Sequence, residues 1–207
     1  MNIKLDSVIT ERAAGLHAAA VFYENIEVGS SPQMLKGRLR LFQESLFFDY
    51  ADGGIPDEPF VKEWQELFKQ LNPSFEKETT PMEDMLIPIS KEQFMESKDS
   101  AHDTIDFFAL KYSLPIMMYD AGKLHEPVRI SLGEKENILL FSDENGIFGD
   151  FKNSFNQHPV SNETKNMLQI IFFPPSIEKS SAVKLLSSLT KMFEQIHGGT
   201  HTVHWLT

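Results

Sequence analysis

Apolar residues recur every three or four positions in four segments of the chain, a spacing that places them on one side of an α-helix. The predicted helices cover residues 32–49, 59–71, 101–113 and 176–197. Ser31 and Ser176 precede two of them and are expected to cap them, and Gly198 is placed to end the last one.

Residues 73–94 are also partly helical in composition, but Pro81 and Pro88 interrupt them. Proline ends or kinks a helix, so this segment predicts short helical turns rather than one helix. We expect the chain to form a single domain over residues 1–207, with any boundary between lobes near residues 73–100.

Short apolar or alternating runs bounded by turn residues predict β-strands. They cover residues 2–6, 17–29, 115–122, 128–132, 137–143, 146–151, 166–173 and 201–206. Asn145-Gly146 favours a tight hairpin turn with positive φ. The run at 166–173 is apolar enough to predict a central strand, with the helix at 176–197 covering one face of its sheet. The predicted class is therefore a mixture of α and β elements.

The composition of the chain indicates which partners it can bind and in which compartment it is expected. The chain has 30 acidic and 19 basic residues, giving a formal net charge of −11, which opposes binding of duplex nucleic acid through its phosphates. It has no cysteine, which excludes disulfides and thiolate chemistry. No run is long and apolar enough for a membrane span, so we expect a cytoplasmic protein without membrane contact.

The sequence contains no motif that predicts a bound cofactor or metal. The sequence has no Gly-rich dinucleotide loop, Walker loop, nucleophile elbow or zinc-protease motif, so we predict no cofactor. His201 and His204 would point to opposite faces of a strand, which argues against a shared metal. The basic trio Lys36, Arg38 and Arg40 is either a phosphate contact or the solvated flank of a helix.

The segment from Asp99 to Asp106 places polar and acidic groups at the front of a core-facing helix. Carboxylates are favoured there by the helix dipole and by unpaired N–H groups, so helix capping is one interpretation. The other is that Asp103 and Asp106 face a pocket, where they could receive an ammonium group or polarise a water. His102 and Asp106 share a helix face and could form a ligand pair or a local charge pair.

Two stretches, SAHDTIDFFALKYSLPIMMYDAGKL and FSDENGIFGDFKNSFNQHPVSNETKNMLQIIF, resemble the B3/B4 module of phenylalanyl-tRNA synthetase beta chains, and most of all its stand-alone relatives. The matching motifs are the helix entry from Asp99, the strand motif LPxxxYD and the SNETKN segment that begins at Ser161. The resemblance covers roughly residues 15–207. It implies an α+β fold of two interleaved lobes, with mixed or antiparallel sheet and a pocket between the lobes.

In the synthetase this pocket hydrolyses wrongly attached tyrosine from tRNA, so the resemblance implies an editing or binding role and no aminoacylation. It gives His102, Asp103 and His158 as catalytic candidates. The implied ligand-binding candidates are Asp99, Asp103, Asp106, Ser154, Ser161, Thr164 and Asn166. The sequence departs from the family at Asp106, where asparagine is usual, and at Ala109, where serine is usual. Residues 149–159 replace a segment rich in tryptophan and arginine.

These departures leave three hypotheses open. The first is a free-standing aminoacyl-tRNA deacylase, in which pocket groups position the ester and shuttle protons. The second, favoured by the acidity and the lost arginines, is a module that binds an aminoacyl-tRNA end, an amino acid or a similar small ligand without catalysis. The third is a structural domain whose pocket is filled by its own side chains.

Overall fold

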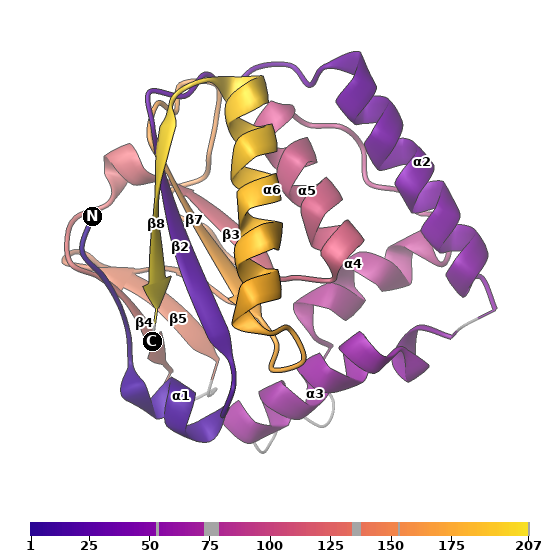
Figure 1. Ribbon diagram of the computed structural model, residues 1–207, viewed down its shortest axis with the longest axis horizontal. Helices are drawn as coiled ribbons and strands as arrows, with labels where there is room; N and C mark the ends of the chain where they lie inside the picture. Colours follow the sequence, from indigo (N-terminus) through magenta and orange to yellow (C-terminus); the bar gives the residue numbers. More distant parts are fainter. Residues whose placement is uncertain (53, 73–78, 134–137, 153, 207) are drawn as a thin grey trace.

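The computed structural model describes residues 1–52, 54–72, 79–133, 138–152 and 154–206. In this part of the chain eight strands form two four-stranded sheets, and six α-helices pack around them (Figure 1). The strands are β1 (Ile3–Leu5), β2 (His17–Glu24), β3 (Ile116–Asp120), β4 (Val128–Leu132), β5 (Leu139–Asp143), β6 (Gly146–Asp150), β7 (Met167–Phe173) and β8 (Thr200–Leu206). The helices are α1 (Ser7–Arg12), α2 (Gln33–Tyr50), α3 (Pro59–Leu71), α4 (Pro81–Ile89), α5 (Ser100–Tyr112) and α6 (Lys179–His197). The α+β class expected from the sequence is confirmed.

One sheet is antiparallel throughout and runs in the order β3-β7-β2-β8. All seven residues of β7 are buried, as its apolar composition predicted, because the strand is internal and both of its faces are covered. The helices α5 and α6 lie over one face (Figure 1), where Tyr23 of β2 packs on Phe193 of α6 with ring centroids 4.4 Å apart. The prediction for this strand and its covering helix is therefore confirmed.

The other sheet is mixed and runs in the order β1-β4-β5-β6, with β1 and β4 parallel. It packs on the second face of the antiparallel sheet through aromatic side chains. Tyr119 of β3 lies 4.8 Å from Phe148 of β6, and Phe172 of β7 lies 6.3 Å from Phe141 of β5, between ring centroids. The main core thus lies between the two sheets and beneath α6.

A smaller apolar cluster joins α2, α3, α4 and α5 at one side of the sheets. Its buried members are Leu39, Tyr50, Ile55, Val61, Leu86, Ile89 and Leu110. This cluster fixes α2 against α5, and so places the loop before α2 beside the first turn of α5. The division of the chain into one domain with a lobe boundary near 73–100 stays a prediction.

Several predicted boundaries need correction. The strand predicted over 17–29 ends at Glu24, because Asn25 has a φ of 56° that no strand residue adopts. The helix caps differ too: Pro32 and Glu178 occupy the N-cap positions of α2 and α6. The hydroxyls of Ser31 and Ser176 donate to Asp103 and Glu63 instead, so both serines serve tertiary contacts.

Two turn predictions are partly right. The β5–β6 hairpin exists, but its two-residue loop is Glu144-Asn145, because Asp143 pairs with Gly146; of the two predicted residues, Gly146 has the positive φ. Within residues 73–94, Pro81 opens a regular helix with a capping box, and Pro88 lies in its last turn rather than breaking it. Residues 73–78 of that segment lie outside the described chain.

Candidate functional site

The candidate residues at the start of α5 lie on one side of the helix. Asp99, His102, Asp103 and Asp106 are spaced by three, four and seven positions, which in an α-helix brings their side chains together. We call these four residues the α5 acidic cluster. Asp99 is the N-cap, and its Oδ1 accepts the backbone N–H groups of Ala101 and His102, each at 2.9 Å.

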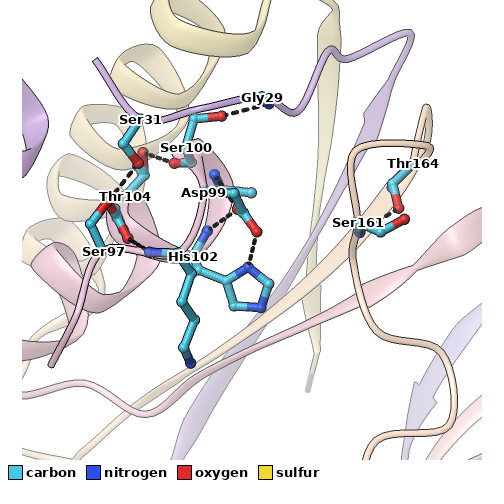
Figure 2. Close-up of polar contacts among 12 residues, drawn as sticks. Gly29, Ser31, Ser97, Asp99, Ser100, His102, Thr104, Ser161 and Thr164 are labelled. Carbon is cyan, nitrogen blue, oxygen red and sulfur yellow. Dashed lines mark hydrogen bonds and ion pairs between the residues drawn. The ribbon is translucent and has the colours of Figure 1, made fainter. Parts of the chain in front are cut away.

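Asp103 is fully buried and its carboxylate is enclosed by donors. It accepts the hydroxyl of Ser31 and the hydroxyl of Ser97, both at 2.5 Å, and the backbone N–H of Lys98 at 2.9 Å. These bonds tie the loop before α2 and the segment before α5 to the helix (Figure 2). The contacts give Asp103 a structural role, and its predicted roles in catalysis and ligand binding stay predictions.

Asp99 and His102 form a second, more accessible pair. The Oδ2 of Asp99 lies 2.7 Å from the Nδ1 of His102, and each side chain is 25% exposed. Burial raises the pKa of Asp99, but hydrogen bonds from the side chain and backbone of His102 and from the N–H of Ala101, with the charge of His102, lower it overall below its ordinary value. In the neutral form of the ring, an ionised Asp99 favours the tautomer with the hydrogen on Nδ1, which leaves the lone pair on Nε2 of His102.

Asp106 is the one acid of the cluster without a hydrogen-bond donor in the part of the chain that the structure describes. Burial raises its pKa to about 6, and the charges of Asp103 and Asp99 act in the same direction. Lys98 and His102 are close enough to lower the pKa, but they do not offset the burial. A half-buried carboxylate in this state is stabilised by any cation that can reach it.

The other candidates lie on the loop between β6 and β7, and their side chains are used in local contacts. Thr164 donates to the buried carboxylate of Asp120 at 2.9 Å and accepts the N–H of Ser161 at 3.0 Å. Figure 2 draws this pair apart from the α5 acidic cluster, and no hydrogen bond or ion pair between described residues joins the two groups.

The remaining three candidates lie on the same loop. Ser154 donates to Asp150 through its N–H and its hydroxyl, and the side chain of Asn166 accepts the N–H of Asn25. The ring of His158 packs near Phe148, with centroids 5.9 Å apart. The ligand and catalytic roles of these loop residues stay predictions.

The structure adds a groove that the sequence did not indicate. It has a volume of about 470 Å³ and lies between residues 25–32, the first residue of α5 and the last turn of α6. His197 lines it and is 2% exposed, with Nδ1 2.8 Å from the carbonyl of Phe193 and Nε2 without a hydrogen-bond partner in the described residues. Burial lowers the pKa of His197, against the opposing effect of the Phe193 and Ser100 backbone, so the ring is neutral at pH 7.

No strong signal in the sequence marks His197, because it looks like an ordinary helix-terminal residue before Gly198. Ser31 was missed because only the tertiary structure brings it to the α5 acidic cluster. Ser97 and Lys98 directly precede Asp99 in the chain, but no sequence pattern showed that this segment turns back onto Asp103.

No group of three or more metal-ligating side chains occurs within the described ranges. Along β8, His201 is half-buried and contacts Glu194 of α6, whereas His204 is exposed, as the alternation of a strand requires. Among the helices of the described chain, none combines the length and the apolarity needed to cross a membrane.

Comparison with known proteins gives one near relative. The chain is 95% identical over 207 residues to "Uncharacterized protein YhzB" of Bacillus subtilis (strain 168), covering 100% of both sequences. The chain belongs to the YhzB family. That relative's name assigns no activity, and no protein-family model matches the chain.

Among solved structures, one similar chain is an N-terminal fragment of the phenylalanyl-tRNA synthetase beta-subunit from Pyrococcus horikoshii, at 9% sequence identity and a TM-score of 0.48. The match covers 97% of the present chain and 50% of the synthetase fragment, so the chain spans about half the length of that fragment. A similarity at this identity and TM-score assigns no function to the chain.

Proposed function

We propose that the chain binds a small amino-acid-like ligand through its ammonium group at the α5 acidic cluster. The observation that carries the proposal is Asp106, a half-buried carboxylate that has no donor among the described residues and a pKa raised to about 6. An ammonium group beside it would supply both the hydrogen bonds and the positive charge that this carboxylate lacks. Asp99, 25% exposed and ionised, adds a second negative charge nearby.

The sequence supports the same class of ligand. The helix entry from Asp99 and the LPxxxYD and SNETKN motifs resemble a module whose synthetase relatives handle an amino acid attached to tRNA. The net charge of −11 and the absence of the arginine-rich segment weaken an RNA-backbone grip but do not affect ammonium recognition. The amino-acid part of an aminoacyl-tRNA end, or a free amino acid, is therefore the ligand that the site suits best.

The experiment is calorimetric titration with a panel of free amino acids and their methyl esters, at pH values from 5 to 8. Because an ammonium and a proton compete for Asp106, affinity should rise by up to about tenfold per pH unit below 6 and level off above it for the free amino acids. The methyl esters should lose affinity again toward pH 8, because their own ammonium group loses its proton there. The matching deamino acids, which lack the ammonium group, should not bind. Asp106→Asn should remove both the binding and its pH dependence, whereas Glu11→Gln, an exposed acid on α1, should change neither.

Binding that is independent of pH, or unchanged in Asp106→Asn, would contradict the proposal. Equal affinity for the deamino acids would do the same, because it would show that the ammonium group is not recognised.

A second function, hydrolysis of an aminoacyl ester, is favoured by the Asp99–His102 pair. Asp99 orients the imidazole through a 2.7 Å contact, so Nε2 could take a proton from a water that attacks the ester carbonyl. The bond from the carbonyl carbon to the ribose oxygen would then break, and His102 would return the proton to that oxygen. This gives a free amino acid and an uncharged tRNA end.

The two functions are separated by His102→Gln. If the chain is a deacylase, purified protein hydrolyses mischarged tRNA, and His102→Gln loses that activity while still binding the amino acid. If the chain only binds, the native protein leaves the ester intact at every enzyme concentration, and His102→Gln binds as the native protein does.

A further inference from the structure

The outer face of α2 carries a line of large apolar side chains that no described part of the chain covers. Met34, Leu41 and Phe48 are 67%, 67% and 79% exposed. Seven residues make nearly two helical turns, so these three side chains lie one above another along the helix. Figure 1 shows α2 at the edge of the molecule, with α4 and α5 on its inner side. We call Met34, Leu41 and Phe48 the α2 stripe.

The α2 stripe lies on a different face of the helix from the residues that pack in the core. The inner face of α2 already buries Leu35, Leu39, Gln43 and Tyr50. The other exposed large apolar residues of the described chain are scattered over different elements, at Val8, Ile147, Phe155 and Val183. Isolated exposed apolar residues are ordinary, whereas three in one line on an already packed helix indicate an interaction surface.

The residues around Leu41 form a pattern that is self-complementary when read outward in both directions. Three positions away on either side stand Arg38 and Glu44, which have opposite charges. Four positions away stand Gly37 and Ser45, which are both small, and a Cβ added at Gly37 would meet no atom within 4 Å. Seven positions away are the large apolar ends of the stripe.

The other charged residues of α2 are also divided by sign at Leu41. The basic residues Lys36, Arg38 and Arg40 lie before Leu41, and the acidic residues Glu44 and Asp49 lie after it. An antiparallel neighbour with the same sequence would place basic against acidic at both ends and would oppose the two helix dipoles. A parallel neighbour would place Arg38 against Arg38.

We propose that the α2 stripe binds a second copy of this chain, as an antiparallel helix pair with a twofold axis at Leu41. Leu41 then packs on Leu41 of the second copy, and Met34 packs on Phe48 of the second copy. Gly37 and Ser45 allow the two backbones to approach closely. Glu44 contacts Arg40 of its own helix at 2.7 Å through Oε1, which leaves its other oxygen for Arg38 of the second copy.

The contact is limited to one helix face, so the dimer is of moderate affinity and depends on protein concentration. A helix of 18 residues is about 27 Å long, which buries less surface than an obligate dimer does. The surface is separate from the α5 acidic cluster, and its test does not depend on the ligand.

The first test is sedimentation equilibrium of the native protein over a range of concentrations. The native chain should pass from monomer to dimer, and Leu41→Glu, which sets two like charges on the axis, should be monomeric throughout. Val183→Glu, the same kind of change at an exposed apolar residue of α6, should dimerise like the native chain. Arg38→Glu should weaken the dimer at least tenfold, and adding Glu44→Arg should restore it.

The second test uses the absence of cysteine, which makes any introduced thiol unambiguous. Under mild oxidation Leu41→Cys should cross-link to itself. Phe48→Cys and Met34→Cys should each remain uncross-linked alone but form a mixed disulfide when combined. A native chain that is monomeric at all concentrations overturns the proposal, as does a dimer that survives Leu41→Glu. Self-linking of Phe48→Cys would show a parallel pair and overturn the antiparallel arrangement.

Discussion

Two aspartates three positions apart on α5 illustrate how surroundings divide the roles of one residue type. Asp103 is fully buried and accepts three hydrogen bonds, so its charge is compensated by donors. Asp106 is half-buried and has no donor among the described residues, so its charge is costly. Removing the carboxylate should therefore lower the stability of the fold at Asp103 and raise it at Asp106.

For Asp106→Asn we expect higher stability at neutral pH. Burial raises the pKa of Asp106 from 3.8 to about 6, so the folded state holds the proton more tightly than the unfolded state. The protonated Asp106 side chain contributes to the free energy of unfolding in full below pH 3.8, and this contribution is lost as the pH rises through 6. Asp106→Asn should be about 1 to 3 kcal/mol more stable than the native chain at pH 7.5.

The measurement is urea unfolding of both proteins across this pH range. The difference between them should shrink as the pH falls and vanish near pH 4. A constant difference, or a less stable variant at neutral pH, would show that ionisation of Asp106 does not destabilise the fold.

For Asp103→Ala we expect a loss of about 2 to 4 kcal/mol, because the hydroxyls of Ser31 and Ser97 and the N–H of Lys98 lose their acceptor. The matched control is Asp57→Ala, which removes an exposed ion pair with Lys62 and should cost less than 1 kcal/mol. Thermal or urea unfolding measures both. If Asp103→Ala were neutral, the carboxylate would be serving a ligand rather than the fold.

At the scale of elements, the two sheets meet through a contact that needs glycine. Tyr119 of β3 lies against Gly149 of β6, where an added Cβ would be 2.5 Å from the phenol oxygen and 2.8 Å from a ring carbon. The Tyr119 ring is itself fixed between Phe141 and Phe148. The ring cannot retreat without disturbing the aromatic layer between the sheets.

We therefore expect Gly149→Ala to destabilise the chain by about 2 kcal/mol or more, measured by urea unfolding. Gly54→Ala is the matched control, because a Cβ there meets nothing within 4 Å and its φ of −76° is one that alanine adopts freely. Adding Tyr119→Phe to Gly149→Ala should recover part of the loss by removing the nearest atom. A harmless Gly149→Ala would mean that the sheets can separate at this point.

Another element-scale contact holds the segment before α5 in place. The side-chain amide of Gln43 on α2 accepts the N–H of Met95 at 2.7 Å and donates to its carbonyl at 3.3 Å. This pairing imitates a strand contact and sets the path of residues 95–98 toward Asp103. The position of the α5 acidic cluster thus depends on α2 as well as on α5.

At the scale of the whole molecule, we predict that the chain neither activates amino acids with ATP nor charges tRNA. The sequence has no phosphate-cradling glycine-rich loop, and the module it resembles lies outside the aminoacylation subunit. Purified protein should give no ATP–pyrophosphate exchange with any amino acid, including those that bind in the titration. Exchange that co-purifies with the protein and scales with its concentration would refute this prediction.

The fold class and most of the elements could be predicted from the sequence alone, although the short helix α1 and the regular form of α4 could not. Local periodicity depends on residues that are neighbours in the chain, so α3, α5 and α6 begin and end close to their predicted positions, and the buried run at 166–173 is the internal strand β7. His102 and Asp106 could be placed on one face because helical spacing alone brings positions four apart together, and the charge of His102 does act on Asp106.

What these residues face depends on contacts between segments that are far apart in the sequence. The Ser31 hydroxyl reaches Asp103 from 72 positions away, and the groove at His197 is formed by a loop and two helix ends that are distant in sequence. Ser31 and Ser176 were expected to cap helices, but contacts with Asp103 and Glu63 took their hydroxyls. Burial and long-range partners fix the charge of a side chain, and no local pattern records either of them.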